Sequence, residues 1–109
     1  RLRHLEQEQM HVMFLDTKCK LIKDKLITSG TINQSLISPR EIFVEALRCN
    51  CVNIVLIHNH PSGDPTPSRD DINSTIRVQR AGKIIGIKLI DHIIIGDNTY
   101  SSLRALKLI

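Results

Sequence analysis

The sequence predicts a single α/β domain with a mixed sheet, built in two or three layers. Its 109 residues leave room for one modest core, and 41% of them are hydrophobic. Apolar runs of strand length alternate along the chain with two segments of helical periodicity. This alternation of strands and helices is typical of one α/β unit rather than of two domains.

The first part of the chain is expected to form strands. An apolar run over residues 9–15 ends at a turn signal over 16–18, and residues 19–27 carry the next apolar positions, so a hairpin is the simplest arrangement. A third strand is expected over residues 32–37, after the break at Ser29-Gly30-Thr31.

A helix is expected over residues 39–49. Pro39 suits the first turn of a helix, and four apolar residues follow at helical spacing: Ile42, Phe43, Ala46 and Leu47. Residues 52–57 are mostly apolar and partly β-branched, in a run short enough for a strand that is buried on both faces. That strand leads directly into His58.

The last part of the chain predicts one more helix and a strand pair. The helix begins at Ser68, continues to about Arg80 and ends at Ala81-Gly82. Residues 84–95 are rich in Ile and Leu and are interrupted at 91–92. A turn over residues 96–98 and a short final element from Tyr100 complete the domain.

Composition excludes several classes of protein. The net charge of +4 is compatible with binding to a polyanion, but no Trp, one Tyr and two Phe leave almost no platform for stacking bases. No apolar run is long enough to span a membrane, and no signal peptide is visible, so a cytoplasmic protein is expected. The odd set of Cys19, Cys49 and Cys51 also favours a reducing compartment. Because the chain begins with Arg1, we expect a domain of a longer protein.

The residues that carry chemistry concentrate between His58 and Asp71. His58 and His60 stand at i and i+2 at a strand end, so their imidazoles point the same way and can converge on one ion. A loop then returns the chain to Asp71, which could supply a third ligand. Zinc accepts such ligands and lowers the pKa of a bound water to about 7, a property that hydrolases use.

Each of these residues also has a plainer interpretation. His58 and His60 could be a hydrogen-bonded pair, and Asp71 could belong to a capping box in which Ser68 is the N-cap. The two interpretations of Asp71 can hold together. His92 is interpreted as a core or rim histidine with satisfied hydrogen bonds, and Glu41 as a favourable charge in the first turn of a helix.

The segment HNHPSGDPTPSRDD resembles the JAMM (MPN-plus) metalloprotease pattern, His-x-His-Pro, six residues, then Ser-x-x-Asp. The resemblance to the bacterial RadC branch is closer still, and covers residues 8 to 104. It rests on FLDTKCKLI, SGTINQS, PREIFVEAL, HNHPSGDPTPS and LIDHIIIGDNTYSSL. Ser38 departs from this pattern, since RadC proteins usually have His there, and Cys49 and Cys51 stand at positions often filled by other residues.

This resemblance implies a JAMM-type domain over residues 1–109, with a curved mixed β-sheet flanked by helices. It implies one zinc ion held by His58, His60 and Asp71, with water as the fourth ligand. It also implies that Glu8, rather than Glu6 or Glu41, accepts the proton of that water, and that Ser68 stabilises the oxyanion.

Two classes of function follow as expectations. The first is a zinc-dependent metallopeptidase that cleaves a peptide or isopeptide-like amide. The alternative is a DNA-associated accessory domain in which a basic face matters, formed by Lys18, Lys20, Lys23 and Lys25. A solvated strand edge is the plainer interpretation of these lysines. A metal-dependent nuclease is a third possibility, since a metal-activated water can attack phosphorus as well as carbon. RadC proteins are labelled as DNA repair proteins, but the helix-hairpin-helix-like region that usually precedes this domain is absent from this chain.

Overall fold

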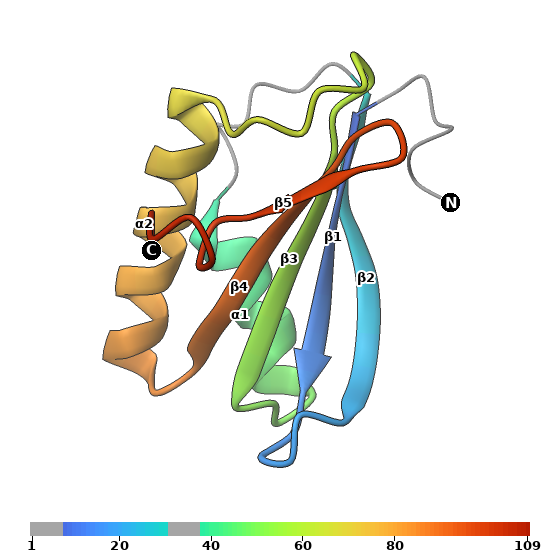
Figure 1. Ribbon diagram of the computed structural model, residues 1–109. Coiled ribbons are helices and arrows are strands. Elements are labelled where there is room, and N and C mark those ends of the chain that lie inside the picture. Colours follow the sequence, from blue (N-terminus) through green and yellow to red (C-terminus); the bar gives the residue numbers. More distant parts are fainter. Residues whose placement is uncertain (1–7, 31–37) are drawn as a thin grey trace.

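The computed structural model describes residues 8–30 and 38–109, which form five strands and two helices (Figure 1). The strand expected over residues 32–37 lies outside the described residues. Neither helix in the described ranges is long and apolar enough to cross a lipid bilayer. The elements, in chain order, are β1 (Glu8–Leu15), β2 (Leu21–Gly30), α1 (Pro39–Arg48), β3 (Asn53–Asn59), α2 (Arg69–Ile85), β4 (Lys88–Ile95) and β5 (Tyr100–Ser102).

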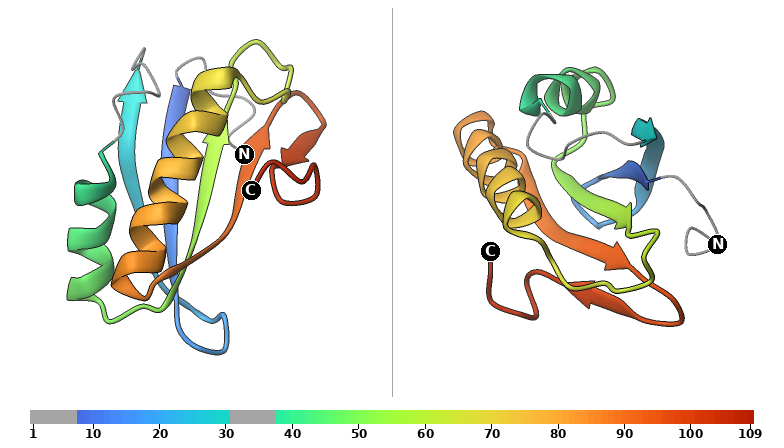
Figure 2. Two further views of the ribbon diagram at one scale, coloured as in Figure 1. Left: turned by 90° about the vertical axis from the view of Figure 1, so that its left-hand side faces the viewer. Right: turned by 90° about the horizontal axis from the view of Figure 1, so that it is seen from above.

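The strands form one mixed sheet in the order β2-β1-β3-β4-β5. β1 pairs with β2 and β3 in antiparallel fashion, β3 and β4 are parallel, and β5 returns antiparallel to β4. The sheet is curved, and α1 and α2 both lie on the same side of it (Figure 2). The predicted mixed α/β sheet is therefore confirmed, and the two-layer alternative holds rather than the three-layer one.

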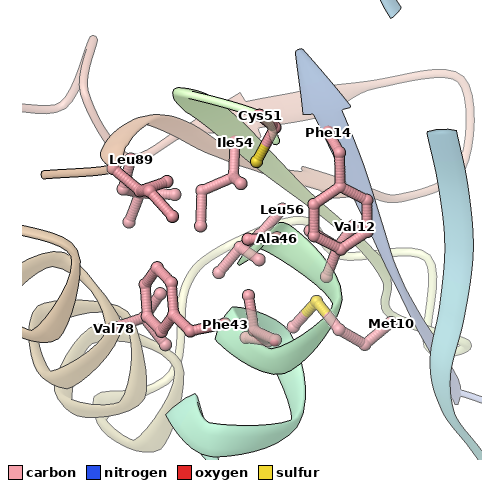
Figure 3. Packing of buried hydrophobic residues seen from close by; sticks show 12 residues of the cluster. Met10, Val12, Phe14, Phe43, Ala46, Cys51, Ile54, Leu56, Val78 and Leu89 are labelled. Atoms are coloured by element: carbon pink, nitrogen blue, oxygen red, sulfur yellow. The ribbon is translucent and has the colours of Figure 1, made fainter. Parts of the chain in front are cut away.

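The core fills the space between the sheet and the two helices (Figure 3). Alternate residues of β1 and β3 point into it, because side chains along a strand alternate between the two faces. Burial of one such large apolar side chain contributes about 1.5–3 kcal/mol. The core cluster contains twelve side chains, each with at most 5% of its surface exposed: Met10, Val12, Phe14, Ile42, Phe43, Ala46, Cys51, Ile54, Leu56, Val78, Ile87 and Leu89.

α1 matches its predicted span to within one residue. Pro39 is its first residue, and Ser38 is its N-cap, with a hydroxyl that accepts a hydrogen bond from the backbone N–H of Arg40 at 3.2 Å. The serine that departs from the usual family residue therefore has a structural role here. Cys49 caps the other end, where its N–H donates to the carbonyl of Glu45.

The predicted end of α2 was wrong, because the helix runs through Ala81-Gly82 to Ile85. The residue that ends it is Gly86, which adopts a left-handed conformation with φ of 91°. Gly82 serves a different purpose, since a Cβ there would lie 2.2 Å from the carbonyl oxygen of Ile87. A glycine can end a helix or allow two segments of backbone to approach closely. In α2, Gly86 does the first and Gly82 the second.

The expected strand over 84–95 was also corrected, since β4 begins at Lys88 and Asp91 and His92 lie within it. The irregularity is one residue earlier, where the parallel register with β3 skips Ile90. Both residues that looked like an interruption are held by hydrogen bonds. Asp91 accepts from the N–H of His92 at 2.7 Å, and the His92 ring bonds to Thr75 at 2.6 Å.

β2 forms one edge of the sheet and carries two lysines of the predicted basic cluster. Lys23 and Lys25 form ion pairs with Glu45 of α1, at 2.8 and 2.9 Å. These two hydrogen bonds lower the pKa of Glu45 to about 2. Two of the four lysines in the predicted basic cluster are therefore paired with α1 and do not form an unpaired basic face.

Candidate metal centre

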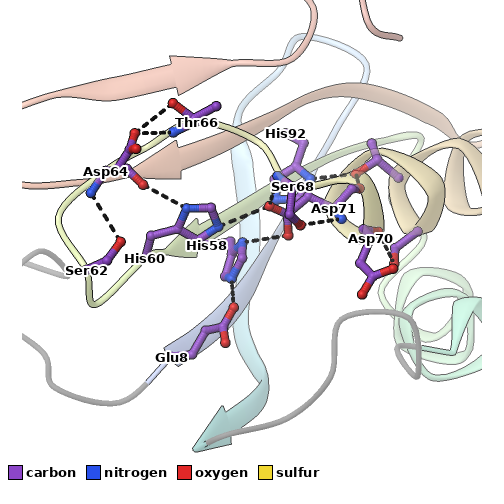
Figure 4. A network of polar contacts seen from close by, with 12 residues as sticks. Glu8, His58, His60, Ser62, Asp64, Thr66, Ser68, Asp70, Asp71 and His92 are labelled. Carbon is purple, nitrogen blue, oxygen red and sulfur yellow. Dashed lines mark hydrogen bonds and ion pairs between the residues drawn. The ribbon is translucent and has the colours of Figure 1, made fainter.

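His58 and His60 come together at the end of β3, as their spacing predicted (Figure 4). His58 lies within the strand, paired with Met10 of β1, and its side chain is 0% exposed. His60 follows the strand, and its side chain is 16% exposed. The two rings stand edge to face with centroids 4.8 Å apart. Both imidazoles therefore face one small volume of space.

Asp71, in the first turn of α2, reaches both rings. Its Oδ2 lies 3.0 Å from Nε2 of His60, and its Oδ1 lies 3.6 Å from Nδ1 of His58. The predicted capping box is present as well: Ser68 Oγ accepts from the N–H of Asp71, and Asp71 Oδ2 accepts from the N–H of Ser68. Asp71 is thus a capping residue that also faces the histidines.

Glu8 completes the group from the start of β1. Its carboxylate makes a short contact with Nε2 of His58, and its side chain is 26% exposed. Glu8, His58 and His60 each offer a ligand atom, and these atoms lie within 4.8 Å of one another. Because Met10 is paired with His58, the antiparallel register of β1 and β3 brings Glu8 to the same end of the sheet.

One of the two rivals of Glu8 lies elsewhere in the fold. Glu41 lies in the first turn of α1, as predicted from its charge. Glu6 lies outside the described residues. Spacing along the chain gave little support to Glu8, since 50 residues separate it from His58. The pairing of two strands supplies the proximity that the sequence spacing could not.

The ring of His60 is oriented by a second contact. Its Nδ1 lies 2.9 Å from the carbonyl oxygen of Asp64, in the loop that follows β3. Since a carbonyl only accepts, Nδ1 carries a proton and donates it. Nε2, which bonds to Asp71, is the ring nitrogen that would bind a metal in place of its own proton. Metal-binding histidines commonly have such a partner on the other ring nitrogen.

A further pair of residues supports the group from behind. His92 is buried, as predicted, and its ring centroid lies 5.8 Å from that of His58. The predicted satisfaction of its hydrogen bonds holds for Nδ1 alone, since Nε2 is buried and has no hydrogen-bond partner among the described residues. His92 Nδ1 donates to Oγ1 of Thr75 at 2.6 Å, and Thr75 donates in turn to the carbonyl of Asp71 at 2.6 Å. Sequence reasoning missed Thr75. Its signal was the distance of four residues from Asp71, which places both on one face of a helix.

Burial and hydrogen bonds set opposite protonation preferences within the group. Burial lowers the pKa of His58, whereas the hydrogen bond with Asp71 raises the pKa of His60. Burial alone would raise the pKa of Asp71, but hydrogen bonds with His60 and with the Ser68 backbone outweigh it and lower that pKa to about 2. Asp71 is therefore an anion at neutral pH.

The donor set fits a divalent cation. Asp71 Oδ1 is a buried oxygen to which no hydrogen bond is donated by the described residues, and it faces an imidazole nitrogen at 3.6 Å. A buried carboxylate oxygen without a donor is costly, and a bound cation would remove that cost. Two imidazoles with carboxylates are ligands that zinc and other first-row divalent metals accept.

The fold and this cluster define a class of protein, the JAB domains, which are α/β domains that include metalloenzymes. Within that class the chain belongs to the RadC-like JAB domain family, whose model matches residues 1–108.

Relatives of this family support the assignment. The chain is 55% identical over 103 residues to a UPF0758 protein of Clostridium perfringens, and 51% identical over 105 residues to one of Clostridium botulinum strain Langeland. In both comparisons 94% of this chain is matched, and the chain spans 45% of the relative's length. These relatives are therefore about twice as long as the region that they share with this chain.

Proposed function

We propose that this domain is a zinc-dependent hydrolase of the JAMM type that cleaves a peptide or isopeptide-like amide. His58, His60 and Asp71 would hold one zinc ion, Glu8 would act as general base, and Ser68 would stabilise the oxyanion. One observation carries the proposal: two imidazoles and two carboxylates from β1, β3 and α2 lie at one end of the sheet, although they are far apart in sequence. Glu8 contacts Nε2 of His58, and Asp71 faces Nδ1 of His58 and Nε2 of His60.

The surroundings of the two carboxylates support different roles for them. The side chain of Asp71 is 0% exposed, and its Oδ2 accepts a hydrogen bond from the Ser68 N–H at 2.8 Å. A fixed, buried anion of this kind suits a permanent metal ligand. The side chain of Glu8 is 26% exposed, so it can meet a water molecule and exchange protons with it.

Zinc, when bound, would activate a water molecule and polarise the substrate carbonyl. Glu8 would accept a proton from that water and later deliver it to the nitrogen of the leaving amine. Ser68 Oγ accepts from the N–H of Asp71 at 3.0 Å, so its own hydrogen is the one it can donate. A hydrogen bond from Ser68 to the carbonyl oxygen would strengthen as negative charge develops there.

The accessory DNA-binding role has less support. It requires a basic face, and Lys23 and Lys25 are paired with Glu45. A nuclease is disfavoured for the same reason, since a substrate rich in phosphates calls for unpaired cations. DNA association and a cytoplasmic location remain predictions.

Metal content and hydrolysis of the same variants test the proposal. We expect about one zinc ion per chain in the unaltered protein, measured by inductively coupled plasma mass spectrometry after reconstitution. Asp71→Asn should lose the metal. Glu8→Gln should keep it and lose hydrolysis of a library of fluorogenic peptides and isopeptide-linked substrates. Asp70→Asn is the matched control, because Asp70 is an exposed acid in the same helical turn.

The outcomes separate the parts of the proposal. An unaltered protein that takes up no metal would overturn the hydrolase assignment. Loss of zinc in Glu8→Gln, with retention in Asp71→Asn, would reverse the roles of the two carboxylates. Zinc binding without hydrolysis of any substrate in the library would contradict the peptidase activity and favour a structural metal.

A further inference from the structure

The β3–α2 loop, defined as residues 60–68, lies against the turn of residues 96–99 between β4 and β5. Two backbone hydrogen bonds join the loop to the end of β4 and the turn, and a third closes the turn. His60 N–H donates to the carbonyl of Ile95 at 2.9 Å, and Asp97 N–H donates to the carbonyl of Gly63 at 2.7 Å. Gly96 N–H donates to the carbonyl of Thr99 at 2.9 Å and closes the turn itself.

Gly96 is the point of closest approach between the turn and the loop. A Cβ on Gly96 would lie 2.2 Å from the carbonyl oxygen of Gly63 and 2.8 Å from Cδ of Pro65. The first of these is a backbone atom, which cannot rotate away as a flexible side chain can. Any residue other than glycine at position 96 therefore pushes the β3–α2 loop off the turn.

Gly63 is the matching residue on the loop. Its φ is +88°, a conformation that side chains rarely adopt, and a Cβ there would lie 3.1 Å from Cβ of Asp97. The two glycines thus allow the same contact from its two sides. An alanine at position 63 disturbs the contact in two ways, because it strains the backbone at this φ and brings its Cβ to 3.1 Å from Cβ of Asp97.

The segment held in this way bears on the ring of His60. Asp64, next to Gly63, provides the carbonyl that accepts the proton of His60 Nδ1. The Asp64 carboxylate accepts from both the N–H and the hydroxyl of Thr66, at 3.0 and 2.7 Å, so the loop is also braced internally (Figure 4). A displaced loop would move as a unit and carry the Asp64 carbonyl away from His60.

We infer that the β4–β5 turn is a positioning element of the metal centre, in which Gly96 seats the β3–α2 loop so that the Asp64 carbonyl orients His60. The inference rests on the proposed function, because it assigns His60 as a metal ligand. The atoms nearest to a Cβ on Gly96 belong to Gly63 and Pro65 and not to either histidine, so Gly96 is a positioning residue that acts through Gly63 and Asp64.

The test compares Gly96→Ala with two other variants. Titration with Co²⁺, followed by its visible absorption, should give affinity lower by about 10- to 100-fold in Gly96→Ala, as for other losses of outer contacts to metal ligands. Gly63→Ala changes the same contact from the side of the loop, should also lose affinity, and serves if Gly96→Ala does not fold. Gly82→Ala is the control, since its Cβ would also meet a carbonyl oxygen at 2.2 Å, but at the far end of α2. It should lose stability and keep its affinity for Co²⁺.

A second readout needs no metal. Hydrogen-bonded protons exchange slowly with solvent, so the Asp97 amide and the His60 Nδ1–H should give protected NMR signals in the metal-free protein. Both should lose protection in Gly96→Ala and keep it in Gly82→Ala. Unchanged protection in Gly96→Ala, or an equal loss of Co²⁺ affinity in Gly82→Ala, would overturn the inference. If the unaltered protein binds no Co²⁺, the proposed function fails, whereas the NMR signals still decide whether the turn orients His60.

Discussion

Ser68 and Asp71 bond to each other twice, through opposite groups. The Ser68 hydroxyl accepts from the backbone of Asp71 at 3.0 Å, and the Asp71 carboxylate accepts from the backbone of Ser68 at 2.8 Å. The helix start and the proposed metal centre therefore share the same two side chains. A change that weakens one of these roles also affects the other.

Replacement of Ser68 tests this double role. Ser68→Ala removes the acceptor at the N-cap of α2, which should lower the free energy of unfolding by about 1 kcal/mol. Ser68→Thr keeps the hydroxyl and should retain most of the stability. Urea denaturation measures the difference. A Ser68→Ala variant as stable as the unaltered protein would contradict the capping role.

Metal should stabilise the folded domain, because the ligands converge only in the native structure. Zinc at 100 times its dissociation constant should raise the free energy of unfolding by about 2.7 kcal/mol. Thermal unfolding with zinc and with a chelator gives the comparison. Asp71→Asn should show no difference between the two conditions, whereas a stabilisation that persists in this variant would point to zinc bound elsewhere.

Acid should weaken the attachment of α1 to β2. The pKa of Glu45 is lowered from its ordinary 4.5 to about 2 in the folded protein, so the unfolded chain binds the proton more readily. The resulting stability is present above pH 4.5 and is lost as the pH falls from there toward 2. Urea midpoints measured across this range should fall less steeply in Glu45→Gln. Glu41→Gln, an exposed change in the same helix, should keep the original slope.

The chain from His92 through Thr75 to Asp71 should contribute to stability. Thr75→Val preserves the shape of the side chain but leaves the buried Nδ1–H of His92 without its acceptor. The expected cost is about 1–3 kcal/mol. Thr75→Ser retains the hydroxyl and should recover most of it. An equal loss in both variants, measured by urea denaturation, would assign the effect to the lost methyl group instead.

A buried and an exposed isoleucine should differ in how much they contribute to stability. Ile54→Ala, at a position with 0% exposure, should lower the free energy of unfolding by about 2–5 kcal/mol. Ile84 is 88% exposed, so Ile84→Ala should change that free energy by no more than about 0.5 kcal/mol. Denaturant unfolding of both proteins checks the pair, and a large effect at Ile84 would indicate that another surface covers it.

Local patterns in the sequence predicted most of the elements and the histidine pair. Pro39 and the apolar spacing after it identify α1, and the strand position of His58 and His60 makes their side chains converge. The end of α2 was missed because two glycines stand near it, and only the close contact at Gly82 distinguishes their roles. Such contacts depend on tertiary packing, which local patterns do not contain.

The remaining residues of the site come together through the pairing of strands, which local sequence patterns do not predict. Glu8 reaches His58 through the register of β1 and β3, which no spacing rule predicts. Its assignment came from family resemblance. The close contact between Gly63 and Gly96 was not predicted at all. Neither residue carries a functional group, and they come together only when the sheet has formed.

The antiparallel pairing of β1 with β3 also has a consequence for how the centre comes into being. Residues 8 and 58 are far apart in the chain, and such long-range strand pairing forms more slowly than local helices and hairpins. Asp71 enters only when α2 has begun to form on the sheet. During synthesis the proposed metal centre therefore stays incomplete until the ribosome has released more than half of this domain, so metal uptake would follow the pairing of β1 with β3 rather than precede it.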